Sequence, residues 1–292
     1  AEEATGIRRR LADAHPDAYL PHLAASLSNL SAVLSELGRR DQALIPAEEA
    51  TGIRRRLADA HPDAYLPHLA ESLNNLSTFL SGLGRRDQAL APAEEATGIY
   101  RRLAETHPDA YLPNLAASLN NLSIFLSGLG RRDQALAPAE EATRIRRRLA
   151  DANPDAYLPH LAGSLNNLGT VLSELGRRDQ ALALSEEAVT IRRRLADAHP
   201  DAYLPHLARS LWAYGWVCVK VKANFAEALE SVTEAISLYA PLAEHLPGVF
   251  AGPMFSACRT LADVLDGLGR TGEAADWRRQ LDEAAGGGPD TG

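Results

Sequence analysis

The sequence repeats itself every 46 residues. Nearly the same segment begins at Ala1, Ala47, Ala93 and Ala139, and again at Ser185 with a changed first residue. A period of this size is typical of solenoids, in which each unit buries its apolar face only against its neighbours. We therefore expect an all-α, right-handed α-solenoid of stacked antiparallel helix pairs. Its function should depend on an extended surface rather than on a catalytic pocket.

Each repeat contains a first helix with a leucine stripe. In the first full repeat the leucines are spaced three and four residues apart, which predicts one apolar face on a helix over about 18–37. Pro21 is expected in the first turn of this helix, where a missing N–H costs little, and Gly38 should end it in a left-handed conformation. The stripe consists of Leu20, Leu23, Leu27, Leu30, Leu34 and Leu37.

A second helix should follow to about Ala60, with a small inner face that lets the two helices pack closely. That face contains Ala43, Ala47, Ala50, Ile53 and Leu57.

The charged residues of the second helix are expected on its solvated side. We assign the run Arg54-Arg55-Arg56 to an outer face, with Asp59 placed to pair with Arg55 at i,i+4. The adjacent Glu48 and Glu49 point to different sides of a helix, so they do not form an acid–base pair.

The period divides the chain into one half-repeat and six repeats, about thirteen helices in all. The half-repeat contains only a second helix, the fifth repeat diverges and carries one extra residue, and the sixth caps the array. The predicted segments are 1–15, 16–62, 63–108, 109–154, 155–200, 201–247, 248–285 and a disordered tail, 286–292.

Composition narrows the functional classes. The formal net charge of −8 argues against nucleic acid, which needs a basic stripe. No apolar run is long enough to span a membrane, and no secretory signal is visible, so we expect a cytoplasmic protein. Cys218 and Cys258 fall at apolar helical positions and are expected to be small buried residues. Because the chain starts inside a repeat and not at Met, we expect a fragment or a processed end of a longer protein.

The fourth repeat carries a family resemblance. Leu165-x-x-Leu168-Gly169-x-x-Leu172 is followed by Leu175-Gly176, Ala181, Ser185 and Ala188. This resembles the tetratricopeptide pattern, with leucine in place of its aromatic residues. The chain is most similar to the long-helix tetratricopeptide arrays of actinobacteria and cyanobacteria, related to the kinesin-light-chain type. The resemblance implies a scaffold or a peptide-binding module.

No motif for catalysis, cofactor or metal binding is present. The recurring segment His-Pro-Asp-Ala-Tyr-Leu-Pro-His could suggest a metal pair, but Asn114 and Asn153 replace individual histidines. We therefore interpret the histidines as solvated residues near helix ends and predict no metal, no cofactor and no enzyme activity.

Pairs of polar residues recur in the middle of the first helix. Asparagine is a poor helix former, by roughly half a kcal/mol relative to alanine, so something must compensate for its recurrence. One interpretation is hydrogen bonding between helices. The other is a ladder of amides facing a concave groove, which could bind the backbone of an extended peptide. In tetratricopeptide proteins similar asparagines have that role. The ladder comprises Asn74, Asn75, Asn120, Asn121, Asn166 and Asn167.

Other side chains should line the same groove. The candidates are Thr78, Ile124, Thr170 and Arg209. In the fifth repeat Trp212 and Trp216 share a helix face, and they either pack against the sixth repeat or form an aromatic anchor site for a partner.

These features predict a non-catalytic scaffold that binds a peptide or protein segment in its concave groove. Two alternatives stay open: a structural module that self-associates, and a regulatory segment of a larger signalling enzyme. Because the leading half-repeat exposes Ile7 and Leu11, homo-association through the N-terminal end is also expected.

Overall fold

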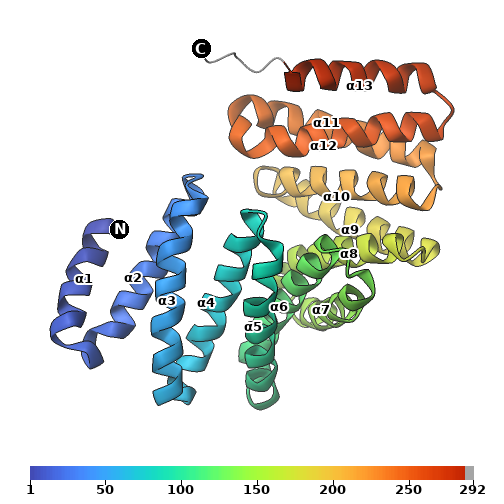
Figure 1. Cartoon of the computed structure of the whole chain (residues 1–292). Coiled ribbons are helices and arrows are strands. Elements are labelled where there is room, and N and C mark those ends of the chain that lie inside the picture. Colours follow the sequence, from blue (N-terminus) through green and yellow to red (C-terminus); the bar gives the residue numbers. More distant parts are fainter. Residues whose placement is uncertain (287–292) are drawn as a thin grey trace, which may run out of the picture. The chain divides into compact units, whose positions relative to one another are not determined.

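The computed structural model describes residues 1–286, which form thirteen helices and no strand (Figure 1). The predicted all-α solenoid of helix pairs is confirmed. Most of the predicted tail, residues 287–292, lies outside the described residues. The helices are α1 (Glu2–Ala14), α2 (Pro16–Glu36), α3 (Arg40–Ala60), α4 (Pro62–Gly82), α5 (Arg86–Thr106), α6 (Pro108–Gly128), α7 (Arg132–Ala152), α8 (Pro154–Glu174), α9 (Arg178–Ala198), α10 (Pro200–Val221), α11 (Phe225–His245), α12 (Pro247–Gly267) and α13 (Thr271–Gly286).

The chain forms two compact units, which divide after Ile145, inside α7. In each unit a helix packs mainly against the helices before and after it in sequence. We call the even-numbered helices A helices and the odd-numbered ones B helices. Neighbouring A helices also contact one another, as α4 does α6 in the first unit and α10 does α8 and α12 in the second.

Proline and glycine set the helix ends. Pro16 occupies the first turn of α2, so this helix begins two residues earlier than predicted and Pro21 lies in its second turn, not its first. At the other end Gly38 has φ +75°, as expected for a left-handed cap. The Arg39 amide then donates to the Leu34 carbonyl over 2.9 Å, which satisfies one of the free carbonyls at the helix end. The same conformation recurs at Gly84, Gly130, Gly176 and Gly269.

Leucine from the A helix packs beside alanine from the B helix throughout both units. Leu27 and Ala43, predicted on the inner faces, are 1% and 0% exposed. Cys218 and Cys258 are buried, as predicted. The buried equivalents of Leu27 are Leu73, Leu119, Leu165 and Leu211, and those of Ala43 are Ala89, Ala135, Ala181 and Ala228.

The contact between paired helices changes composition along the array. In the first repeat Ser31 stands opposite the B helix and its hydroxyl donates to the Ala43 carbonyl over 3.0 Å. In the fourth repeat the equivalent residue is Gly169. A Cβ there would lie 2.6 Å from the Ser185 hydroxyl, where earlier repeats have alanine. In the fifth repeat Gly215 faces Val232 in the same way. A smaller residue on one helix thus accommodates a larger one on the other.

This exchange predicts the outcome of a swap in the fourth repeat. Gly169→Ser alone should destabilise the protein by about 1–3 kcal/mol, because the added atoms overlap the Ser185 side chain. Adding Ser185→Ala should restore stability, since the pair then matches the first three repeats. Thermal melts of both variants and of Ser185→Ala alone would measure this. A double variant as unstable as Gly169→Ser would contradict the explanation.

The first arginine of the triple-arginine run is buried, so its assignment to the outer face was wrong. Arg54 is 8% exposed, and its guanidinium donates to the His68 carbonyl over 3.1 Å and to the Ser72 hydroxyl over 2.6 Å. Its long side chain thereby joins α3 to α4. Burial lowers the pKa of Arg54, and the carboxylate of Glu71 acts in the opposite direction.

The junction between the second and third repeats, from α5 to α6, is built differently. Tyr100 replaces the arginine and is 4% exposed. Burial raises the pKa of Tyr100, while a hydrogen bond from Asn114 lowers it. Asn114 occupies the position that histidine has in other repeats, so the two substitutions occur together.

We predict that the two junctions are interchangeable. The free energy of unfolding of the double variant Arg54→Tyr/His68→Asn should lie within about 1 kcal/mol of that of the native chain. The two positions then carry the same residues as Tyr100 and Asn114. Arg54→Ala should cost about 2–4 kcal/mol, because it leaves a cavity and takes away two hydrogen bonds. Denaturant unfolding of the three proteins would compare them. Equal losses for both variants would refute interchangeability.

The second arginine of the run pairs between repeats instead of within its helix. Arg55 forms an ion pair with Glu95 of the next B helix rather than with Asp59. Each such exposed ion pair contributes about 0–1 kcal/mol to the stability of the fold. The series therefore adds little stability, and its main effect is to favour one alignment of each B helix with the next. The other pairs are Arg9–Glu49, Arg101–Glu141, Arg147–Glu187 and Arg193–Glu234.

Candidate functional site

The predicted partner-binding residues all lie on A helices, but they divide between the two units. Those from Asn74 to Ile124 belong to α4 and α6 of the first unit, and those from Asn166 to Trp216 to α8 and α10 of the second. Each unit therefore presents its own candidate surface.

In the first unit an asparagine pair joins two A helices. Asn74 is half-buried, and its side-chain oxygen accepts a hydrogen bond from the Asn121 amide over 3.2 Å, which joins α4 to α6. Asn120 is also half-buried. The hydrogen bonds between helices expected as one interpretation therefore occur. They do not involve Asn75.

The exposed part of this surface consists of Asn75, Thr78 and Ile124. Within the described residues the Asn75 side chain forms no hydrogen bond, whereas the Thr78 hydroxyl donates to the Asn74 carbonyl over 3.0 Å. Ile124 is 41% exposed, an unusual value for a large aliphatic side chain. A carboxamide without a hydrogen-bond partner among the described residues, on the same A-helix surface as an exposed aliphatic group, suits contact with a polypeptide.

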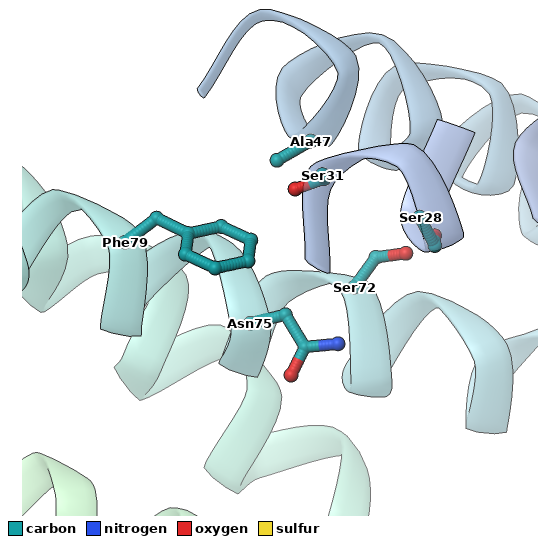
Figure 2. A pocket seen from close by; sticks show the side chains of 6 residues that line it. All are labelled: Ser28, Ser31, Ala47, Ser72, Asn75 and Phe79. Carbon is teal, nitrogen blue, oxygen red and sulfur yellow. The ribbon is translucent and has the colours of Figure 1, made fainter. Parts of the chain in front are cut away.

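Asn75 also lines a small pocket between α2 and α4. Figure 2 shows Asn75 and Phe79 of α4 across from Ser28 and Ser31 of α2, with Ala47 and Ser72 completing the walls. Its volume of about 10 Å³ is enough for roughly one water molecule. The pocket can hold a solvent molecule or the end of a small side chain.

In the second unit both asparagines, Asn166 and Asn167, are less exposed than Asn75. The Asn166 amide donates to the Ser210 hydroxyl on α10 over 2.7 Å, and its oxygen is buried without a partner among the described residues. The Thr170 hydroxyl donates to the Asn166 carbonyl over 2.9 Å. Asn167 is half-buried.

The two tryptophans of α10 differ in their surroundings. Trp212 is half-buried, packs near Tyr239, and its indole N–H donates to the Thr260 hydroxyl on α12 over 3.0 Å. It therefore takes part in the packing of the sixth repeat. Trp216 is also half-buried, but the Lys220 ammonium lies 5.1 Å from the centre of its ring, within cation–π distance.

Two residues missed in the sequence belong to this region. Lys220 follows Trp216 by four residues, so helical spacing alone could have placed it on the same face. Arg192 is 8% exposed on α9, and nothing in its local sequence distinguishes it from its solvated neighbours. Arg209, which was predicted, is exposed.

The B-helix side of the first unit is hollowed between repeats. The two hollows have volumes of about 700 and 600 Å³ and occupy equivalent places, 46 residues apart. Two leucines of an A helix are among the residues that line each hollow, Leu20 and Leu23 in one and Leu66 and Leu69 in the other.

Within the described residues, no cluster of three or more His, Cys, Asp or Glu side chains could hold a metal ion. None of the helices described combines the length and the apolar character that a membrane span requires.

Sequence comparison identifies the repeats. Four stretches, 23–63, 69–109, 115–155 and 161–201, match one tetratricopeptide repeat model, which thereby covers more than half of the chain. The chain belongs to the tetratricopeptide repeat family. A second tetratricopeptide model matches residues 256–280 near the end of the array. The family predicted from the fourth repeat is confirmed. A search of curated proteins gave no match.

Solved structures share the fold. BtubC (BKLC) from P. vanneervenii has a TM-score of 0.60 at 18% identity, over 87% of this chain and 94% of its own. A putative kinesin light chain from Podosopora anserina has a TM-score of 0.50 at 21% identity, over 74% of this chain and 94% of its own. A Rap protein complexed with Competence and Sporulation Factor has a TM-score of 0.55 at 12% identity, over 94% of this chain and 81% of its own.

The tryptophan surroundings predict different responses to a soluble quencher. In variants that keep one tryptophan and replace the others, including Trp277, by phenylalanine, acrylamide should quench Trp216 more strongly than Trp212. Trp212 is held against α12, while Trp216 is covered on one face by a flexible lysine. Stern–Volmer plots would measure the difference. Stronger quenching of Trp212 would show that the indole–Thr260 contact does not shield it.

Proposed function

We propose that this tetratricopeptide array is a non-catalytic interaction module, which binds an extended segment of a protein partner along its A-helix surfaces. The observation that carries the proposal is the exposed carboxamide of Asn75, which has no hydrogen-bond partner among the described residues and lies beside Thr78. A carboxamide can donate and accept at once, which suits the N–H and C=O groups of a polypeptide backbone.

The division of roles among the asparagines supports this proposal. Asn74 and Asn166 are bonded to the neighbouring A helix, so they hold successive A helices together. Asn75 follows next in sequence and points to a different side of α4. Asn74 thus holds neighbouring A helices together, and Asn75 is available to a partner.

The family fold supports the same conclusion. Tetratricopeptide repeats are generally non-catalytic, and one structure with this fold is a Rap protein complexed with Competence and Sporulation Factor. A surface built from successive helices also offers the extended contact that such binding requires.

Self-association through α1 stays a separate prediction. Ile7 and Leu11 on this helix are 45% and 36% exposed, so an apolar strip is available to a second copy. A cytoplasmic location also stays a prediction.

The proposal can be tested on the full chain with peptides selected from a displayed library. Asn75→Ala should weaken the binding of peptides that contact the first unit by about three- to tenfold, the equivalent of one hydrogen bond. Stability should be unchanged or about 0.5 kcal/mol higher, since alanine is the better helix former. Calorimetric titrations and thermal melts would separate the two effects.

Gln42→Ala is the matched control, because it takes an exposed carboxamide from α3 rather than from an A helix. It should leave binding unaltered. If no peptide is selected, or if the two variants behave alike, the A-helix surface is not the binding site.

A further inference from the structure

Helix α10 carries a cationic and aromatic stripe that the other A helices lack at the same positions. Arg209, Trp216 and Lys220 are spaced i, i+7 and i+11, which places them on one face of the helix. The stripe extends over about 16 Å. The equivalent residues are Glu71, Thr78 and Gly82 on α4, Ala117, Ile124 and Gly128 on α6, and Gly163, Thr170 and Glu174 on α8.

The first of these positions reverses its charge relative to α4. There, a carboxylate oxygen of Glu71 lies 3.7 Å from the guanidinium of the buried Arg54 and 4.0 Å from the His68 ring. The acid on the A helix thus balances the cation that comes from the preceding B helix. In α10 the corresponding residue is Arg209, so a cation stands where a counter-ion would be needed.

The buried arginine of this junction also has different hydrogen-bond partners from its equivalent in the first repeat. Arg192 corresponds to Arg54, yet its guanidinium donates backwards to the Pro159 carbonyl on α8 over 2.6 Å. Ser210, the equivalent of Ser72, is bonded to Asn166 instead. The Nε of Arg192 is buried and has no partner, and neither Arg192 nor Arg209 forms an ion pair within residues 1–286.

Titration behaviour is consistent with this crowding of positive charge. Burial lowers the pKa of Arg192 to about 10, with the Arg209 charge acting in the same direction. The pKa of His206 is lowered by burial and then by the charges of Arg192 and Arg209. An unpaired cation in a partly desolvated place gains from any anion that reaches it.

We propose that the α10 stripe binds an acidic segment of a protein partner, whose carboxylates pair with Arg209 and Lys220 while Trp216 contacts the chain between them. The buried charge of Arg192 adds to the local positive potential that selects carboxylates. This inference rests on the proposed function, because it assigns a partner class to the A-helix surface of the second unit.

A segment suits the stripe better than a single ion does. The two exposed cations lie about 16 Å apart along α10, so one small anion cannot contact both. The net charge of −8 repels acidic polymers from the molecule as a whole, so binding of such a polymer would have to be local.

The test uses the full chain and a short, end-blocked peptide of alternating Glu and Ala, with its Gln–Ala counterpart as the neutral control. Calorimetry should detect binding of the Glu–Ala peptide and none of the Gln–Ala peptide, and the affinity should fall as salt is added. The fluorescence of Trp216, in the variant that keeps only this tryptophan, should change with the same peptide. Arg209→Glu should weaken the binding of this peptide by about tenfold or more. This variant restores the acid–arginine arrangement of α4, so its melting temperature should not fall.

Arg194→Glu is the charge-matched control, because Arg194 is exposed on α9 and changes the net charge equally. It should bind the peptide as the native chain does. Equal binding by Arg209→Glu, no binding by the native chain, or equally tight binding of inorganic phosphate would overturn the proposal. If library peptides still bind the first unit, the proposed function survives such a result; if no segment binds either unit, both fail.

Discussion

The close approach of a leucine-bearing A helix and an alanine-rich B helix is the constraint on which the rest of the structure depends. Leu27 and its equivalents are almost fully buried, and each lies in a repeat whose B helix buries alanine at the position of Ala43. Small residues bring the backbones together, so a single additional atom at the contact matters. The replacement of Ser31 by Gly169 and Gly215 in later repeats shows that a larger residue on the B helix is matched by a smaller one on the A helix.

The sequence predicts the fold well because the period and the apolar spacing act together. Thirteen helices, the glycine caps and the buried cysteines follow from those two signals. The burial of Arg54 does not, because a run of three arginines gives the same local pattern whether the first is solvated or inserted between helices. What identifies it is the concerted change to Tyr100 and Asn114 at the junction of the second and third repeats, a comparison between distant positions. The Arg55–Glu95 pair is likewise a contact between repeats, invisible within one helix.

The candidate site was predictable only in part. Periodicity places Asn75, Thr78 and Ile124 on the A helices, and the structure shows that all three are exposed. Periodicity alone cannot distinguish Asn75 from Asn74, because both are asparagines that recur with the same period. In the structure Asn75 is exposed and Asn74 faces a neighbouring helix. The different roles of Trp212 and Trp216 also depend on Thr260 and Lys220, one of them 48 residues away from its partner.

A repeat protein acquires specificity where its repeats stop being identical. Positions that hold the helices together tolerate only compensated changes, as at Gly169 and Ser185. On the A-helix surface the equivalent positions vary in charge: Ala25, Ala117 and Gly163 are neutral, Glu71 is acidic and Arg209 is basic. A carboxylate oxygen of Glu71 lies 3.7 Å from the guanidinium of the buried Arg54 and balances its charge, whereas Arg209 adds a second positive charge near the buried Arg192.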